Sequence, residues 1–237
     1  MSIIDKDAYF KYLERKGQSG YKAAILVKEA SETMYSLLVA SETVPSVFGS
    51  QDSFEFDLLN SPVKGKIPGK MTLDDKEVEV LHHRDNVYRF EKLKDKVLDF
   101  LYVDSQFVGY KFSGTISYRA NDASADVLRG TYTITPMSAD PTPILNARSL
   151  CKETLCFASV VPDTVKAGDK INLSVVQTSA TVLYTAKKIA DDGKETDAEA
   201  ITGSVFTAPA GGGLYAITAS DSASTYAPWT TTVYVEA

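Results

Sequence analysis

Apolar and polar positions along residues 1–140 follow patterns that predict mostly β-strands. Two short apolar runs, YKAAILVKEA and ETMYSLLVA, are separated by a polar stretch and predict a hairpin. Glutamate and valine alternate over residues 77–80, which is typical of a half-buried strand. FVGYKFSGTISYRA and VLRGTYTITPM are rich in β-branched and aromatic residues, and the polar turn NDASAD between them predicts a second hairpin.

A single amphipathic helix is predicted where the apolar spacing changes to steps of three and four residues. Asp85 is suited to cap its N-terminus. The apolar positions that follow are Val87, Phe90, Leu93, Val97, Phe100 and Leu101. These positions share one side of a helix, so we expect one helix over residues 85–101.

The stretch from Ser41 to Gly69 loses this regularity. Prolines and glycines interrupt any long ladder, and one strand is predicted from Phe54 to Leu58. So long a connection is uncommon in a compact domain unless it is functional or is ordered by a partner. Its apolar content is too high for a disordered linker. We therefore expect neighbours to bury these side chains: Val44, Val47, Phe48, Leu58 and Leu59.

Beyond about residue 140 the spacing of apolar residues loses its periodicity. The composition also changes there, and Thr, Ala, Val and Gly become common. We place a first domain over residues 1–145, a linker over 146–156 and a second domain over 157–237. Short strands at regular spacing suggest that the second domain is a β-sandwich of the Ig-like class. The predicted strands lie in LCFASVVP, KINLSVVQT, TVLYTAKKIA, AITGSVFTAP, GLYAITASD and TTTVYVEA.

Two local features of the second domain are expected to face solvent. DDGKETDAE lies between two predicted strands and is interpreted as an exposed loop tip. Trp229 follows Pro228 and is expected at the surface or at a sheet edge.

Composition limits the classes of function. The chain has 237 residues, of which 44% are apolar and 24% charged, so it should fold and bury a core. The formal charge of -6 is mild, and neither half has the basic stripe of a nucleic-acid clamp; a channel whose wall repels DNA would fit equally well. No apolar run approaches the roughly 18 residues of a membrane span, and the charged N-terminal stretch is not the pattern of a secretory signal peptide.

No arrangement of reactive residues predicts catalysis. His82 and His83 are adjacent on a predicted strand, so their side chains should point to opposite faces. Cys151 and Cys156 form one local pair without further metal ligands nearby. GxSxG, CxxC and HExxH motifs are absent, and AGGGLYA precedes a predicted strand rather than a phosphate-binding helix. We therefore expect no enzyme, no cofactor and no metal site.

Two acidic clusters are interpreted as solvated surfaces. The first consists of Asp74, Asp75, Glu77 and Glu79. Because Lys76 is interleaved and the strand alternates, a solvated face is favoured over a pair of catalytic carboxylates. The second consists of Asp191, Asp192 and Asp197, whose spacing fits no EF-hand calcium loop.

The order of the predicted elements resembles that of the major tail tube protein of long, non-contractile-tailed bacteriophages, the siphophages. The helix from Asp85 to Leu101, followed by FVGYKFSGTISYRANDASADVLRGTYTITPMSADPTP, is similar to the helix and closing hairpin of that fold, over about residues 1–145. VFTAP and GLYAITASD are similar to bacterial Ig-like modules that are often appended to such tail proteins. The resemblance implies a mainly β protein, with an N-terminal tail-tube-like β-sandwich or barrel that has one α-helix, and a C-terminal Ig-like β-sandwich.

The family implies a structural protein of the virion, located in the phage tail and assembled in the host cytoplasm. Subunits form rings, typically hexameric, whose sheets join edge to edge into an inner barrel, and the rings stack into a tube that conducts DNA without binding it specifically. Partners would be other copies of the chain and the tape measure, tail tip and tail terminator proteins. The Ig-like domain would lie outside with weak host-surface contacts, and removing residues from about 157 onward should leave assembly intact.

Contacts between rings are expected from the long loop and from an N-terminal arm. Apolar side chains without a partner in one subunit would gain one in the stacked ring, and ring closure would consume open strand edges. The candidates for ring stacking are Val44, Val47, Phe48, Phe54, Phe56, Leu58 and Leu59.

Other classes of function are left open by the sequence. A surface adhesin with Ig-like domains would explain the second domain, although the helix of the first domain and the pattern of the N-terminus weigh against it. A carbohydrate-binding or hydrolytic tail accessory protein would use the acidic cluster and aromatic residues, and would bind sugar as a monomer. A tail terminator or baseplate hub would share the fold family.

Overall fold

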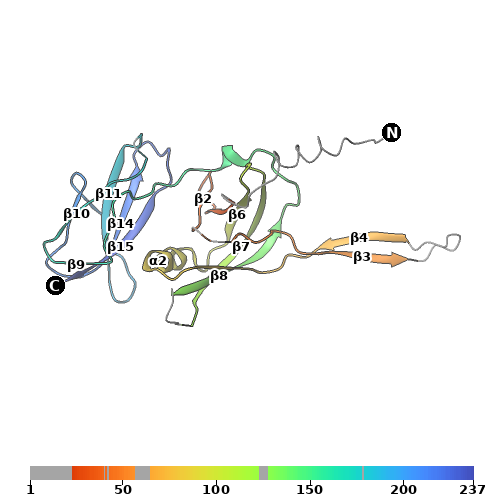
Figure 1. Cartoon of the computed structure of the whole chain (residues 1–237), viewed down its shortest axis with the longest axis horizontal. Helices are drawn as coiled ribbons and strands as arrows, with labels where there is room; N and C mark the ends of the chain where they lie inside the picture. The colour runs from red at the N-terminus through yellow and green to blue at the C-terminus, as the bar shows by residue number, and fades with distance from the viewer. Residues whose placement is uncertain (1–22, 40, 42, 57–64, 123–127, 178) are drawn as a thin grey trace, which may run out of the picture.

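The computed structural model describes residues 23–39, 41, 43–56, 65–122, 128–177 and 179–237. In this part of the chain the protein is mainly β, with several sheets and one α-helix, α2 (Arg84–Leu93), which confirms the predicted fold class at this level. Two β-rich bodies lie on either side of α2 (Figure 1). A long hairpin projects from the N-terminal body, away from the C-terminal one.

The N-terminal body is built on one antiparallel sheet of six strands, in the order β2-β1-β6-β7-β8-β5. The strands are β1 (Ala24–Lys28), β2 (Ser36–Leu37), β5 (Lys76–Leu81), β6 (Leu98–Val103), β7 (Gly109–Ala120) and β8 (Arg129–Ala139). The two predicted hairpins are confirmed as β1–β2 and β7–β8. The strand predicted from alternating glutamate and valine is confirmed as β5.

One face of this sheet packs on the main core of the N-terminal body. Phe100 and Ile134 are fully buried there, and Phe90 of α2 stacks on Tyr118 with ring centroids 4.8 Å apart. Val47, from the loop after β2, belongs to the same core. The helix therefore turns one side to the sheet and leaves its other side to the C-terminal body.

The opposite face of the sheet is partly covered by the chain that leads to the C-terminal body. A 3-10 helix, η1 (Ala147–Leu150), packs over β1 and β6, where Leu101 is fully buried. The chain after η1 then runs beside β2, because the Tyr35 N–H donates to the Leu150 carbonyl and the Lys152 N–H donates to the Tyr35 carbonyl. The edge of the sheet at β2 is therefore occupied.

The helix predicted over residues 85–101 is present only in its first half. α2 ends at Leu93 and β6 begins at Leu98, so the prediction of helix for Phe100 and Leu101 is wrong. Phe100 points into the main core, and Leu101 points into the cluster under η1. β6 is buried on both faces, and such a strand shows no clean alternation of apolar and polar residues. Its apolar positions therefore continued the helical spacing by coincidence.

The C-terminal body is a β-sandwich of a five-stranded sheet, β12-β11-β14-β15-β9, and a two-stranded sheet, β10-β13. The strands are β9 (Thr164–Lys166), β10 (Lys170–Asn172), β11 (Val182–Ile189), β12 (Glu199–Ala200), β13 (Val205–Thr207), β14 (Gly213–Asp221) and β15 (Trp229–Glu236). Ile171 and Phe206 of the small sheet share one core with Ile217 and Val233 of the large sheet. No extended strand forms in LCFASVVP, so that prediction is wrong. Membership of the Ig-like class stays a prediction.

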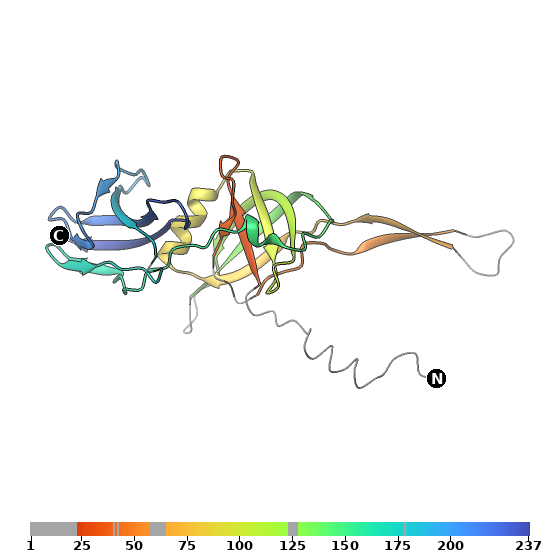
Figure 2. The same ribbon diagram turned by 90° about the horizontal axis from the view of Figure 1, so that it is seen from above.

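The projecting hairpin, called the arm below, consists of β3 (Gln51–Phe56) and β4 (Gly65–Met71). Among the described residues its strands pair only with each other, and they extend well beyond the six-stranded sheet (Figure 2). The strand predicted from Phe54 to Leu58 overlaps β3. Leu58 and Leu59 lie outside the described residues, as does the N-terminal segment expected to contact a neighbouring ring.

Candidate functional site

The arm exposes apolar side chains that no other described segment covers. Phe54 is 66% exposed and Ile67 is 54% exposed, and the two are direct cross-strand partners. A lone two-stranded hairpin is marginal in water, and exposed apolar patches commonly mark surfaces that bind another molecule. The arm is therefore a candidate surface for binding another molecule. Ile67 was not among the residues predicted to contact a neighbour, because Pro68 and Gly69 interrupt the alternation of its strand.

The structure divides the candidate residues of the long loop into two groups. Phe54 is exposed on the arm, and Phe56 lies in the same strand. Val47 is buried in the core of its own subunit, and Val44 and Phe48 pack against that core. The expectation that neighbours must bury these last three side chains is therefore corrected, because the long loop doubles back over the sheet before the arm begins.

The outer face, defined here as the side of the six-stranded sheet away from the main core, is accessible over β7 and β8. It carries a dense set of hydroxyl side chains: Ser113, Thr115, Ser117, Thr131, Thr133, Thr135 and Ser138. Some of them interact across the strands, since Ser113 Oγ and Ser138 Oγ are 2.7 Å apart. Because they alternate with core residues such as Ile116 and Ile134, these hydroxyls lie together and make this part of the outer face polar.

Three of the basic side chains near these hydroxyls are paired with acids. Lys28 Nζ lies 2.8 Å from Asp99, Arg119 lies 3.6 Å from Glu77, and Arg129 lies 3.7 Å from Glu79. The hydrogen bond to Asp99 raises the pKa of Lys28 and keeps its ammonium protonated. Cations that already face a carboxylate contribute little to binding phosphate groups.

The sheet ends at β5 with an open edge. β5 pairs with β8 on one side, and on its other side it pairs with no strand among the described residues. Val78 and Val80 turn inward and are buried, whereas Glu77 and Glu79 lie on the outer face and are exposed. Charges near an open edge discourage indiscriminate pairing, yet the backbone groups remain available to a matched strand.

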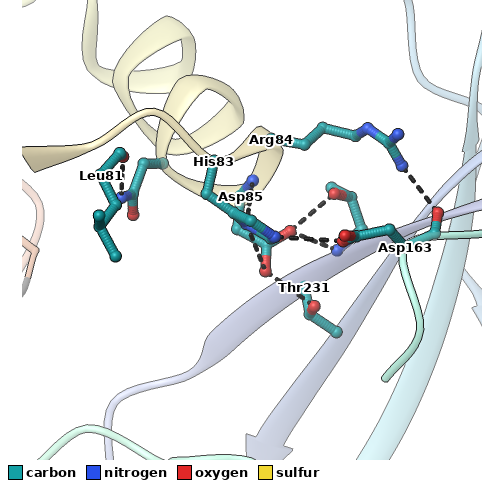
Figure 3. Close-up of polar contacts among 8 residues, drawn as sticks. Leu81, His83, Arg84, Asp85, Asp163 and Thr231 are labelled. Atoms are coloured by element: carbon teal, nitrogen blue, oxygen red, sulfur yellow. Dashed lines mark hydrogen bonds and ion pairs between the residues drawn. The ribbon is translucent and has the colours of Figure 1, made fainter. Parts of the chain in front are cut away.

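A second set of contacts lies where the N-terminus of α2 meets the C-terminal body. Asp85 was expected to cap the helix, but His83 is the N-cap, and its Nδ1 accepts a hydrogen bond from the Asp85 N–H. Asp85 instead accepts from Thr231 Oγ1 at 2.8 Å, from the Thr232 N–H at 2.7 Å and from Thr232 Oγ1 at 2.6 Å (Figure 3). Asp163 adds a contact to His83, at 3.1 Å between Oδ1 and Nε2. The helix is thus bound to the C-terminal body through its first turn.

Glu195 forms a further polar contact between the two bodies. Its side chain is 13% exposed and lies 2.5 Å from the Tyr88 hydroxyl, 2.5 Å from Lys92 Nζ and 3.2 Å from Lys187 Nζ. Burial by itself raises the pKa of this carboxyl, but hydrogen bonds from the three donors outweigh it and lower the pKa from 4.5 to about 2. The interpretation of DDGKETDAE as an exposed loop is confirmed for its other residues, but Glu195 is docked on the helix.

Arg89 and Trp229 complete the contact between α2 and the C-terminal body. The Arg89 guanidinium lies over the indole, 4.7 Å from the ring centroid, and its Nη2 donates to the Leu37 carbonyl. Burial lowers the pKa of Arg89 to about 10, so the side chain stays cationic at neutral pH. Trp229, expected at the surface or at an edge, lies half-buried where the two bodies meet.

We expect the Glu195 contact to weaken in acid. A carboxyl whose pKa is lowered on folding contributes its full stabilisation above its unfolded pKa and loses it as the pH falls toward the folded value. Replacing Glu195 by glutamine should therefore cost roughly 2 kcal/mol above about pH 5, and the difference from the parent protein should shrink toward about pH 2. Urea unfolding of both proteins across this range measures the difference. If the difference in unfolding free energy between the two proteins stayed constant with pH, the negative charge of Glu195 would not contribute to stability.

The histidines, cysteines and acidic residues considered for chemistry are not brought together in the described part of the chain. No group of three or more His, Cys, Asp or Glu side chains there could hold a metal ion. His82 is half-buried and contacts the Tyr118 hydroxyl at 2.7 Å, whereas His83 is exposed and caps α2, so the two histidines share no site. Cys151 and Cys156 are free thiols. Within the described residues, every helix is too short or too polar to cross a membrane.

No protein-family model matches the chain, and no curated protein matches it. The function is therefore inferred from the arm, the open edge of β5 and the outer face.

Proposed function

We propose that this chain is the repeated subunit of the tail tube of a siphophage. Copies of it would assemble into hexameric rings, and the rings would stack into a tube that conducts DNA into the host. The observation that carries the proposal is the arm, because its Phe54 and Ile67 are exposed and no other described segment covers them.

Self-assembly is supported by the difference between the two surfaces involved. The arm projects from one end of the N-terminal body, and the open edge of β5 belongs to the body itself. A contact between two different surfaces of the same chain is heterologous, and repeating it gives a closed ring or a filament rather than a symmetric dimer. Such a contact also removes the open strand edge from solvent.

The outer face is suited to line a channel for DNA. Its hydroxyl side chains carry no charge, and three of its basic residues are paired with acids. Binding to DNA depends largely on basic groups that neutralise phosphates and release counterions. A wall with few free cations would let the duplex pass without being held.

The position of α2 then sets the direction of the C-terminal domain. α2 packs on the core side of the sheet, opposite the outer face, and the C-terminal domain docks on α2. If the outer face lines the channel, the C-terminal domain points away from it, where it can touch the host surface weakly. Further partners would be the tape measure, tail tip and tail terminator proteins of the same virion.

Negative-stain electron microscopy of the purified chain at high concentration tests the proposal. We expect hollow tubes or stacked rings of uniform diameter, either spontaneously or after addition of tail tips as seeds. The seeds are needed because a tube subunit can stay monomeric until it is nucleated. Monomers alone in the presence of seeds would contradict the proposal and would favour the adhesin or accessory classes.

A further inference from the structure

The C-terminal domain has a cavity of about 750 Å³ on the side of its sandwich where β12 lies. The small sheet has two strands and the large sheet has five, so the small sheet covers only part of the large one. β10 and β13 line the cavity from the small sheet, and β11, β12 and β14 line it from the large sheet. A cavity of this size is large enough to hold a small molecule.

Lys188 turns toward this cavity. Tyr184 and Ala186 precede it at steps of two along β11 and are buried in the core of the domain, so strand alternation places Lys188 on the same inward face. Its Nζ lies 5.9 Å from the centroid of the Tyr215 ring and 3.5 Å from the Gly211 carbonyl, to which it donates. In the described part of the chain it pairs with no carboxylate. Because inward lysines are usually paired, this ammonium is available to an anionic group.

Tyr215 supplies a second polar group beside Lys188, since the two are direct cross-strand partners. Tyr215 is 8% exposed, yet its hydroxyl has no hydrogen-bond partner among the described residues. The hydroxyl is not fully enclosed, so a molecule in the cavity can reach it. Burial, together with the negative charge of Glu199, raises the pKa of Tyr215, so the phenol stays protonated and can donate as well as accept.

The rest of the lining combines hydroxyl groups with one carboxylate and an apolar floor. The hydroxyls belong to Thr196, Thr202 and Thr207, and the carboxylate belongs to Glu199. Phe206 forms the floor together with Tyr215, with 5.9 Å between the ring centroids. Hydroxyl and carboxylate groups suit a ligand that has many hydroxyls, and the aromatic floor suits the C–H groups of a ring. The unpaired ammonium adds a preference for a carboxylate.

From this combination we infer that the cavity binds an acidic saccharide. Its carboxylate would lie on Lys188, and its hydroxyls would contact Tyr215 and Glu199. A neutral sugar would leave Lys188 unpaired, and a small inorganic anion would not use the aromatic floor. Lys170, an exposed lysine that also lines the cavity, would serve a second acidic unit. For its biological role the inference rests on the proposed function, because it gives the host-surface contact of the C-terminal domain a class of ligand.

Isothermal titration calorimetry of the full-length chain with a short oligomer of galacturonate tests the inference. We expect saturable binding that Lys188→Gln weakens at least about tenfold, because a charge-assisted hydrogen bond is lost. An oligomer of glucose of the same length should bind at least about tenfold more weakly than the galacturonate oligomer. Added salt should weaken binding of the acidic oligomer, since the ammonium is partly exposed to solvent.

Two further variants separate binding from folding and from net charge. Tyr215→Phe keeps the ring and removes the unpaired hydroxyl, so it should weaken binding roughly threefold or more without lowering the midpoint of urea unfolding. Lys166→Gln removes another exposed lysine, on β9 at the opposite edge of the large sheet, and should bind like the parent protein. Circular dichroism checks that each variant is folded.

Several results would overturn the inference. No saturable binding of the galacturonate oligomer would do so, as would equal binding of the acidic and neutral oligomers. Equal losses in Lys166→Gln and Lys188→Gln would show that only net charge matters. Electron microscopy of the same samples separates this inference from the proposed function. Tubes without saccharide binding would overturn the inference alone, whereas saccharide binding without tubes, even with seeds, would overturn the proposed function and leave the site.

Discussion

Replacing Asp85 by alanine should release the C-terminal domain from α2 and lower the free energy of unfolding by about 3 kcal/mol. Three hydrogen bonds to the carboxylate are lost, two of them from Thr232, which is 1% exposed. A buried N–H or hydroxyl without an acceptor costs most of its desolvation energy. The chain has a single tryptophan, Trp229, and it lies at this contact, so its fluorescence reports the release directly.

Two companion variants make the Asp85 measurement decisive. Asp85→Asn keeps an acceptor oxygen and should fall between the parent protein and Asp85→Ala. Asp192→Ala removes an exposed carboxylate that pairs with Lys194 at the surface, and it should change stability by less than about 0.5 kcal/mol. Equal effects of Asp85→Ala and Asp192→Ala in urea unfolding would contradict the role assigned to Asp85.

The same contacts change the expectation that residues from 157 onward form a separable module. Asp85, Arg89 and Glu195 bind α2 to the C-terminal domain, and α2 also supplies Phe90 to the main core. Removing the domain would uncover the side of the helix that it covers. We therefore expect a truncated chain to be less stable than the intact one, even where assembly itself does not need the C-terminal domain.

Placing aspartate at both exposed apolar positions of the arm, Phe54→Asp/Ile67→Asp, should abolish tube formation without unfolding the subunit. Both side chains are more than half exposed in a single copy, so little burial is lost from the monomer. In the assembled state they would have to be buried against a neighbour, and burying an unpaired charge is strongly unfavourable. We expect a normal circular dichroism spectrum and no polymers in electron micrographs.

A control for the arm variant uses an apolar residue that is even more exposed and lies in the C-terminal domain. Val160 is 89% exposed in the C-terminal domain, and Val160→Asp should assemble like the parent protein. If the arm variant still formed tubes of normal diameter, the arm would not be the contact between subunits. If Val160→Asp also blocked assembly, the effect would reflect added charge rather than the place of the arm.

Local sequence pattern was sufficient for elements with one buried face. β5 alternates buried and exposed residues, so a period of two identified it. β7 and β8 were identified by their β-branched and aromatic residues and by the polar turn between them. The start of α2 was close to its predicted position, because apolar residues spaced three or four positions apart are typical of a helix with one buried side. β6 was misassigned because Phe100 and Leu101 are both buried, on opposite faces, and a doubly buried strand has no period to read.

What the sequence determined by itself is therefore the mainly β class, the two hairpins and the place where one helix begins. Only the tertiary structure decided how the polar residues are used. Asp85 and Thr231 are 146 positions apart, and Glu195 meets Tyr88 across 107 positions, so no local pattern could connect them. The tertiary structure likewise showed that Val47 is buried whereas Phe54 is exposed. Burial and partners of single side chains depend on which distant segments pack together, and local periodicity carries no information about that packing.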